Sequence, residues 1–89
     1  MSSPDSTPAT AFDRVTMFGA DWCRDCIRSK ALLDRLGADY EYIDLVERPE
    51  EADRARQISG RTNIPVVVFP DGRHLVEPTD PELEAALRA

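Results

Sequence analysis

The chain has 89 residues, enough for one small domain and too few for two, because separate hydrophobic cores arise only beyond about 250 residues. Hydrophobic residues make up 42% and charged residues 31% of it, proportions typical of globular proteins that exclude fibrous and wholly disordered classes. The net charge of -6 argues against nucleic acid and anionic membrane surfaces as partners, since both attract clustered Lys and Arg.

Residues 1–11 contain several Ser and Pro and no apolar period, so we expect a disordered tail there and a single domain over 12–89. This start has neither basic residues nor an apolar stretch, so we do not expect a secretory signal. The longest apolar run, 64–70, is far shorter than the roughly 18 residues that a membrane-spanning helix needs. We therefore expect a cytoplasmic protein without a membrane span.

A short alternating apolar stretch at 15–19 ends in a glycine and predicts the first strand. Asp21 follows it and offers a side-chain acceptor for the free N–H groups at the start of a helix. Apolar and small residues recur at helical spacing from Cys26 to Leu36, and Gly37 is a typical C-terminal cap. The sequence thus predicts a first helix that begins at the two cysteines.

Aromatic and β-branched residues are enriched over 40–46, where apolar and polar positions alternate, and predict a second strand. Pro49 and the acidic residues behind it predict the start of a second helix, which ends near a Ser-Gly pair. The β-branched run at 66–69 predicts a strand buried on both faces. A Pro-Asp-Gly turn then leads into a return strand at 73–76, which completes a hairpin.

A short third helix is expected at the end, because Thr79 and Glu82 fit a capping box and Pro81 lies near the first helical position. The predicted order is βαβαββα, an α/β protein. Its strand–helix–strand start implies a right-handed parallel unit, and the hairpin adds an antiparallel strand at one edge. We expect a four-stranded mixed sheet with helices on both faces.

Two cysteines, Cys23 and Cys26, are the only ones in the sequence, too few for the disulfide scaffold of a small secreted domain. They fall where the first strand meets a helix N-terminus, and free N–H groups with the helix dipole stabilise a thiolate there. We expect Cys23 to be the exposed nucleophile and Cys26 to be more buried and protonated. Cys23 would attack an external disulfide, and Cys26 would resolve the mixed disulfide.

Two other interpretations of the cysteines stay open at this stage. They could be a chance pair of structural cysteines, although both would then have to fall at a strand-to-helix junction by accident. They could also bind zinc, but the single His74 leaves a four-ligand set one residue short unless two subunits share the site. We expect no metal there, and we expect His74 to face solvent on the hairpin's return strand.

Two segments carry a family pattern: Cys-x-x-Cys-x-Arg-x-Lys-Ala-Leu-Leu at 23–33, preceded by Trp22, and Ser-Gly-Arg-Thr-Asn-Ile-Pro at 59–65. Both resemble bacterial glutaredoxins, and the Trp22-Cys23 pair resembles, within that family, the actinobacterial mycoredoxins. The segment from Phe69 through Glu77-Pro78-Thr79 is also similar to mycoredoxins. The resemblance implies a thioredoxin fold and a thiol-disulfide oxidoreductase without a bound cofactor, acting as a monomer on disulfide-containing proteins.

The resemblance also implies which residues bind substrate. Pro65 should be cis and lie opposite Cys23, with the Ile64 backbone pairing with a bound thiol. Thr79 and Asp80 match the place where glutaredoxins bind the γ-glutamyl end of glutathione, although both could simply cap the third helix. Trp22, beside the first cysteine, belongs to the same expected substrate-binding set.

The low-molecular-weight thiol that serves as co-substrate should be mycothiol or glutathione, and the sequence favours mycothiol. Asp25 replaces the aromatic residue common in glutaredoxins, and the family's lysine before the first cysteine is missing, since 20–22 read Ala-Asp-Trp. A lysine at that place would bind one of the two carboxylates of glutathione, whereas mycothiol has an uncharged sugar and inositol body. Ten arginines against one lysine also suggest a GC-rich bacterial genome.

Two alternative functions remain from the sequence. One is a thioredoxin-like electron donor that a flavin reductase recharges, because Trp-Cys-x-Asp-Cys is also found in thioredoxin-related proteins. The other is a metal or iron–sulfur module in which Cys23 from two subunits binds a cluster, as in some glutaredoxins.

Overall fold

The computed structural model describes residues 12–89, so the expected tail at 1–11 lies outside the described residues. Seven elements follow one another along the chain: β1 Val15–Gly19, α1 Arg24–Arg35, β2 Tyr40–Asp44, α2 Glu51–Ser59, β3 Val66–Val68, β4 His74–Val76 and α3 Asp80–Arg88. The predicted order βαβαββα is confirmed. Within residues 12–89, no helix is both long and apolar enough to cross a membrane.

The second strand ends two residues earlier than predicted, at Asp44. The Asp44 side chain accepts a hydrogen bond from Val46 N at 2.9 Å, and its carbonyl accepts one from Arg48 N at 2.9 Å. These contacts turn the chain away from the sheet before Pro49 is reached. Helix α2 accordingly begins at Glu51, two residues after the proline that was expected to open it.

The four strands form one mixed sheet in the order β2-β1-β3-β4. Strand β1 is parallel to β2, with Gly19 opposite Asp44, and antiparallel to β3. Strand β4 pairs with β3 as the antiparallel edge strand of the predicted hairpin. Because the parallel strands β1 and β2 end at the same edge of the sheet, the loops that follow them are brought together there.

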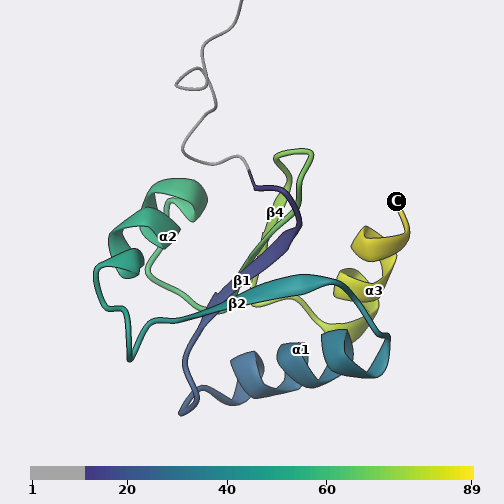
Figure 1. The fold of residues 1–89 in the computed structure, drawn as a ribbon, viewed down its shortest axis with the longest axis horizontal. Helices are drawn as coiled ribbons and strands as arrows, with labels where there is room; N and C mark the ends of the chain where they lie inside the picture. Colours follow the sequence, from purple (N-terminus) through teal and green to yellow (C-terminus); the bar gives the residue numbers. More distant parts are fainter. Residues whose placement is uncertain (1–11) are drawn as a thin grey trace, which may run out of the picture.

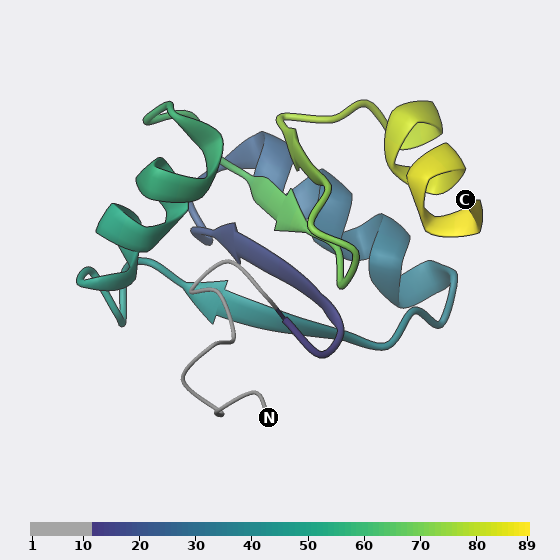
Figure 2. The same ribbon diagram turned by 90° about the horizontal axis from the view of Figure 1, so that it is seen from above.

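Helices cover both faces of the sheet, with α1 and α3 on one side and α2 on the other (Figures 1 and 2). On the first side Met17 and Val67 pack with Leu33 of α1 and Leu83 of α3. On the second side a smaller core forms around Phe18. Val66–Val68 are fully buried because β3 is an inner strand with helices on both faces, as its continuous β-branched run predicts.

Candidate active site

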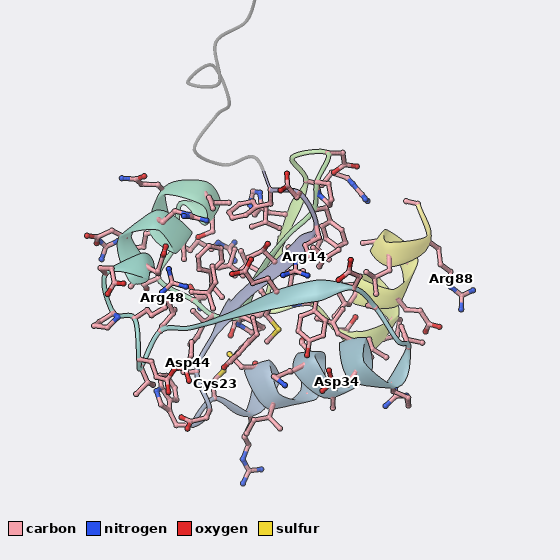
Figure 3. All side chains as sticks on the ribbon, in the orientation of Figure 1. Arg14, Cys23, Asp34, Asp44, Arg48 and Arg88 are labelled. Carbon is pink, nitrogen blue, oxygen red and sulfur yellow. The ribbon has the colours of Figure 1, made fainter. Side chains whose placement is uncertain are left out.

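The site lies at the N-terminus of α1, at the edge of the sheet where β2 ends at Asp44 (Figure 3). Cys23 is the N-cap residue, with an extended backbone at φ -92° and ψ 117°. Its Sγ accepts a hydrogen bond from the Cys26 N–H at 3.2 Å. The sulfur therefore occupies the positive end of the helix, where N–H donors and the dipole stabilise negative charge.

The prediction that Asp21 caps this helix is wrong. Asp21 lies in the turn before α1 and is exposed, while the Cys23 N–H closes that turn on the Ala20 carbonyl at 3.2 Å. The turn brings Cys23 into the N-cap position, three residues before the N–H that its sulfur binds. The cap and the proposed nucleophile are thus the same side chain.

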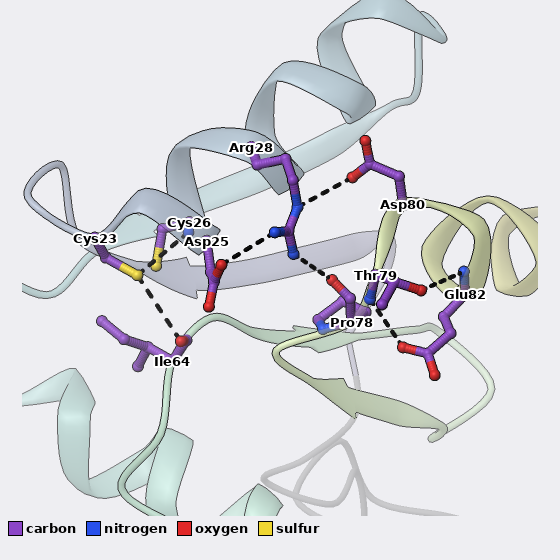
Figure 4. Close-up of polar contacts among 9 residues, drawn as sticks. All are labelled: Cys23, Asp25, Cys26, Arg28, Ile64, Pro78, Thr79, Asp80 and Glu82. Carbon is purple, nitrogen blue, oxygen red and sulfur yellow. Dashed lines mark hydrogen bonds and ion pairs between the residues drawn. The ribbon is translucent and has the colours of Figure 1, made fainter.

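Cys23 is also less exposed than expected, because only 9% of its surface is accessible. It belongs to the core between the sheet and α1, and Ile64 packs against that core from the opposite side. The Cys23 thiol contacts the Ile64 carbonyl, with 3.8 Å between sulfur and oxygen (Figure 4). Its neighbour Trp22 is instead 71% exposed. Cys23 therefore offers little surface to a bound disulfide, and its chain neighbour is a largely exposed indole.

Cys26 lies deeper, with 1% of its surface accessible, as the sequence predicts. Both cysteines are free thiols. Burial, and after it the hydrogen bond with Cys23, raise the pKa of Cys26 to about 12, while a backbone contact with Ala20 lowers this pKa by a smaller amount. Negative charge on Cys23 and Asp25 also raises the pKa of Cys26. Cys26 is therefore a protonated thiol at neutral pH in the reduced protein.

We expect iodoacetamide to modify only Cys23 in the folded, reduced protein near neutral pH. A thiol whose pKa is about 12 is ionised to only about one part in ten thousand at about pH 8, and the thiolate is the reactive form. Intact-mass spectrometry with peptide mapping would count and place the adducts. Modification of both cysteines at comparable rates would contradict this, whereas unfolding in urea should make Cys26 reactive.

Gly19 gives α1 the space to approach the end of β1. A Cβ atom on Gly19 would lie 3.0 Å from Cys26 Sγ and 3.2 Å from Cys26 Cβ. Contacts of 3.0–3.4 Å are tighter than nine in ten real Cβ contacts, so a larger residue would require Cys26 to shift by a few tenths of an ångström. Sequence reasoning used this glycine only as the end of a strand and missed its packing against the second cysteine.

The Ile64–Pro65 peptide bond is cis, as the glutaredoxin resemblance implies. Pro65 is buried, and its carbonyl accepts a hydrogen bond from the Glu77 N–H at 2.9 Å. The Ile64 carbonyl contacts the Cys23 sulfur, so the Ile64–Pro65 segment lies opposite Cys23 (Figure 4). Residues 41 positions apart in the sequence thus form the two sides of the candidate site.

Thr79 and Asp80 start α3, and Thr79 forms the predicted capping box with Glu82. The Thr79 hydroxyl accepts from the Glu82 N–H at 3.2 Å, and the Thr79 N–H donates to Glu82 Oε1 at 2.8 Å. Asp80 forms an ion pair with Arg28 of α1, with 3.3 Å between Oδ1 and Nε. Both residues therefore have partners within the chain.

Arg28 joins the cysteine helix to the start of α3, a role that sequence reasoning missed. Its guanidinium donates to Asp25 Oδ1 at 3.1 Å and to the Pro78 carbonyl at 2.9 Å, besides pairing with Asp80 (Figure 4). Opposite charges three positions apart on a helix could have indicated the Asp25 contact. The two contacts made across 50 or more residues had no signal in the sequence.

Among residues 12–89, no three His, Cys, Asp or Glu side chains gather as a metal site. His74 is exposed on β4, as predicted.

Comparison with known proteins places these features in a family. The glutaredoxin family model matches residues 15–75. The chain is 31% identical over 77 residues to mycoredoxin 1 of Corynebacterium glutamicum, covering 84% of this chain and 94% of that protein. It is 39% identical over 54 residues to a glutaredoxin of Pseudomonas aeruginosa, covering 60% and 63%. A glutaredoxin structure from Archaeoglobus fulgidus aligns with a TM-score of 0.79 at 29% identity, covering 91% of this chain and 92% of that one.

Proposed function

This chain belongs to the glutaredoxin family and is a thiol-disulfide oxidoreductase of the thioredoxin fold, and from that premise we propose that it reduces mixed disulfides at the expense of mycothiol. The observation that carries the reaction is the position of the Cys23 sulfur, which caps α1 and contacts the Ile64 carbonyl. We propose that the reaction takes place in the cytoplasm, where thiols are kept reduced.

In the proposed reaction, the Cys23 thiolate attacks the low-molecular-weight sulfur of a mixed disulfide. The old S–S bond breaks, and the protein cysteine leaves as a thiolate that takes up a proton. A second molecule of the thiol then attacks the adduct on Cys23, which releases the Cys23 thiolate and a symmetrical thiol disulfide. One free thiol molecule is consumed in each cycle: its sulfur leaves in the symmetrical disulfide together with the sulfur taken from the substrate, and the protein cysteine is released in its reduced form.

A protein disulfide would need Cys26 as well. Cys23 would attack one sulfur and release the first substrate thiol, and Cys26 would then attack Cys23 Sγ to release the second. Cys26 must lose its proton in this step, and its raised pKa means that it does so only during the attack. The product is a disulfide between Cys23 and Cys26, which the external thiol reduces.

Two features support mycothiol over glutathione. The start of α3, which would have to bind a γ-glutamyl group, has the N–H and the hydroxyl of Thr79 engaged by Glu82. Mycothiol carries a neutral acetyl group on its cysteine nitrogen, so it does not need a γ-glutamyl binding site at the start of α3. The similarity to mycoredoxin 1 agrees with this choice.

We assign the sugar and inositol body of the thiol to the cleft next to Ile64. This cleft has a volume of about 720 Å³ and is lined by polar side chains. Its lining residues are Asp53, Arg56, Gln57, Gly60, Arg61, Thr62 and Asn63. A polyhydroxylated ligand needs many hydrogen-bond donors and acceptors and no dominant charge, which this mixture of amide, hydroxyl and guanidinium groups supplies.

The test is the ratio of kcat/KM values for reducing one mixed-disulfide substrate with mycothiol and with glutathione. We expect mycothiol to be favoured at least about tenfold, which corresponds to about 1.4 kcal/mol of transition-state preference. A flavin-dependent thioredoxin reductase with its reductant forms a third arm of the assay. Equal or faster turnover with glutathione, or turnover only with the reductase, would contradict the proposal.

A further inference from the structure

A cleft of about 300 Å³ lies between α1 and β2. One of its walls is a stripe of α1, since side chains three and four positions apart on a helix face the same way. The stripe consists of Ile27, Lys30, Ala31 and Asp34. Tyr42 of β2 and the turn that follows β1 line the rest of it. We call this hollow the α1–β2 cleft.

The α1–β2 cleft reaches the cysteine pair. Cys26 lines it, and the Cys26 N–H lies 3.2 Å from the Cys23 sulfur. A chain whose cysteine is bound at Cys23 would bring the side chain of an adjacent residue to the cleft, because consecutive Cα atoms are only about 3.8 Å apart. The cleft proposed for the low-molecular-weight thiol lies beside α2, on the other face of the sheet (Figure 2). The α1–β2 cleft is therefore left for the protein half of a mixed disulfide.

The lining of the α1–β2 cleft is mainly apolar. Ile27 is 53% exposed, and Ala20, Ala31 and the ring of Tyr42 add further apolar surface. Burial raises the pKa of Tyr42 to about 12, so its hydroxyl is uncharged at neutral pH. An occupant would gain free energy by covering this surface with methylene groups.

Asp21 gives the cleft an unbalanced negative charge. The Lys30 ammonium lies 3.5 Å from Asp34 Oδ2 and 5.5 Å from the centroid of the Tyr42 ring, so its charge already has a partner. Asp21 also lines the cleft, is exposed and forms no ion pair within residues 12–89. After burial, negative charge on Asp44 and then on Asp21 helps to raise the pKa of Tyr42. The cleft thus combines apolar walls with a negative potential.

We propose that the α1–β2 cleft binds a lysine or arginine side chain that flanks the reactive cysteine of a protein substrate. The methylene stem of such a side chain would cover Ile27 and Ala31, and its cationic end would pair with Asp21. An acidic side chain would be repelled, and an aliphatic one would leave Asp21 without a partner. This inference rests on the proposed reaction with mixed disulfides, and it adds the class of protein substrate, one whose cysteine has a basic neighbour.

The test uses short blocked peptides with one cysteine, held as a mixed disulfide with mycothiol or glutathione. The residue next to the cysteine, on either side in turn, is lysine in one peptide and norleucine, which has a similar stem without the charge, in the other. The quantity measured is the ratio of kcat/KM for the lysine peptide to kcat/KM for the norleucine peptide. A basic neighbour also makes the substrate thiol a better leaving group, but this effect is the same for every enzyme variant and cancels when their ratios are compared.

Asp21→Asn should lower this ratio about threefold, mainly through a higher KM for the lysine peptide, because one partly exposed ion pair contributes that much. Added salt should lower the wild-type ratio as well. Glu41→Gln is the matched control, since it removes an exposed carboxylate beside Tyr42 in the sequence, on the opposite face of the strand and outside the cleft. The control should keep the wild-type ratio.

Ala31→Leu tests the cleft without changing its charge. Ala31 is exposed and leucine suits a helix, so the fold should persist while the larger side chain fills part of the cleft. The lysine and norleucine peptides should then lose their advantage over a peptide with alanine at the same position. An unchanged ratio in Asp21→Asn, an equal fall in Glu41→Gln, or wild-type discrimination in Ala31→Leu would overturn the inference. The ratio can be measured with either thiol, so faster turnover with glutathione would contradict the mycothiol proposal alone.

Discussion

Replacing Cys23 by serine is expected to bring turnover to the uncatalysed background with every thiol and substrate, a loss of at least about a thousandfold. The Cys23 sulfur caps the helix and contacts the Ile64 carbonyl, and the second cysteine, Cys26, is buried behind it. Serine retains the hydrogen-bond acceptor for the helix but loses the thiolate. Far-UV circular dichroism should therefore show an intact fold beside the lost activity.

Cys26→Ser is the matched control for that variant. It should retain reduction of small-thiol mixed disulfides, because an external thiol can release the adduct on Cys23 without a resolving cysteine. Reduction of protein disulfides should be lost, because the second substrate thiol then has no partner. Activity of Cys23→Ser on either class of substrate would contradict the assignment of Cys23 as the attacking thiol.

Gly19→Ala should destabilise the reduced protein by about 1–3 kcal/mol, the usual cost of forcing an extra methyl group into a packed core. The added Cβ would meet the sulfur and Cβ of Cys26 at 3.0 and 3.2 Å. Against a total stability of roughly 5–15 kcal/mol for a domain of this size, this is a large fraction. Urea unfolding of both proteins under reducing conditions would measure it.

The same substitution should slow closure of the disulfide between Cys23 and Cys26, because Cys26 must shift by a few tenths of an ångström to make room and its sulfur is then less well aligned with Cys23. Gly37→Ala is the control, since Gly37 has φ +66° and no atom within 4 Å of an added Cβ. That variant should lose stability through backbone strain and keep the wild-type closure rate. Equal closure rates in the two variants would show that Gly19 has no special relation to the cysteines.

Local patterns predict most of the fold, because the interactions that define each element lie within a few residues. The capping box of Thr79 and Glu82 needs only a hydroxyl and a carboxylate three positions apart, and the structure contains it. The buried strand at Val66–Val68 follows from three consecutive β-branched residues. The end of β2 was predicted two residues too late, because Asp44 accepts hydrogen bonds from the turn that follows it. The alternation of apolar and polar residues, on which the prediction was based, gives no sign of such side-chain contacts.

The candidate site was predicted only in part, because its second side comes from distant segments. The spacing of Cys23 and Cys26 before a helix indicates dithiol chemistry, and Cys26 is buried as expected. The burial of Cys23 was missed because Ile64, 41 residues away, packs against its core. The cis bond at Pro65 was expected from family resemblance alone, since cis bonds occur in only about 5–6% of such pairs.

Trapping the first intermediate is the most direct test of the proposal that Cys23 attacks and Cys26 resolves. The Cys23→Ser and Cys26→Ser variants would be incubated separately with mycothiol disulfide at neutral pH, quenched with acid and analysed by intact-mass spectrometry with peptide mapping. We predict one mycothiol adduct on Cys23 of the Cys26→Ser protein and none on the Cys23→Ser protein, whose remaining thiol is buried and protonated. An adduct on Cys26 together with an unmodified Cys23 would contradict the account.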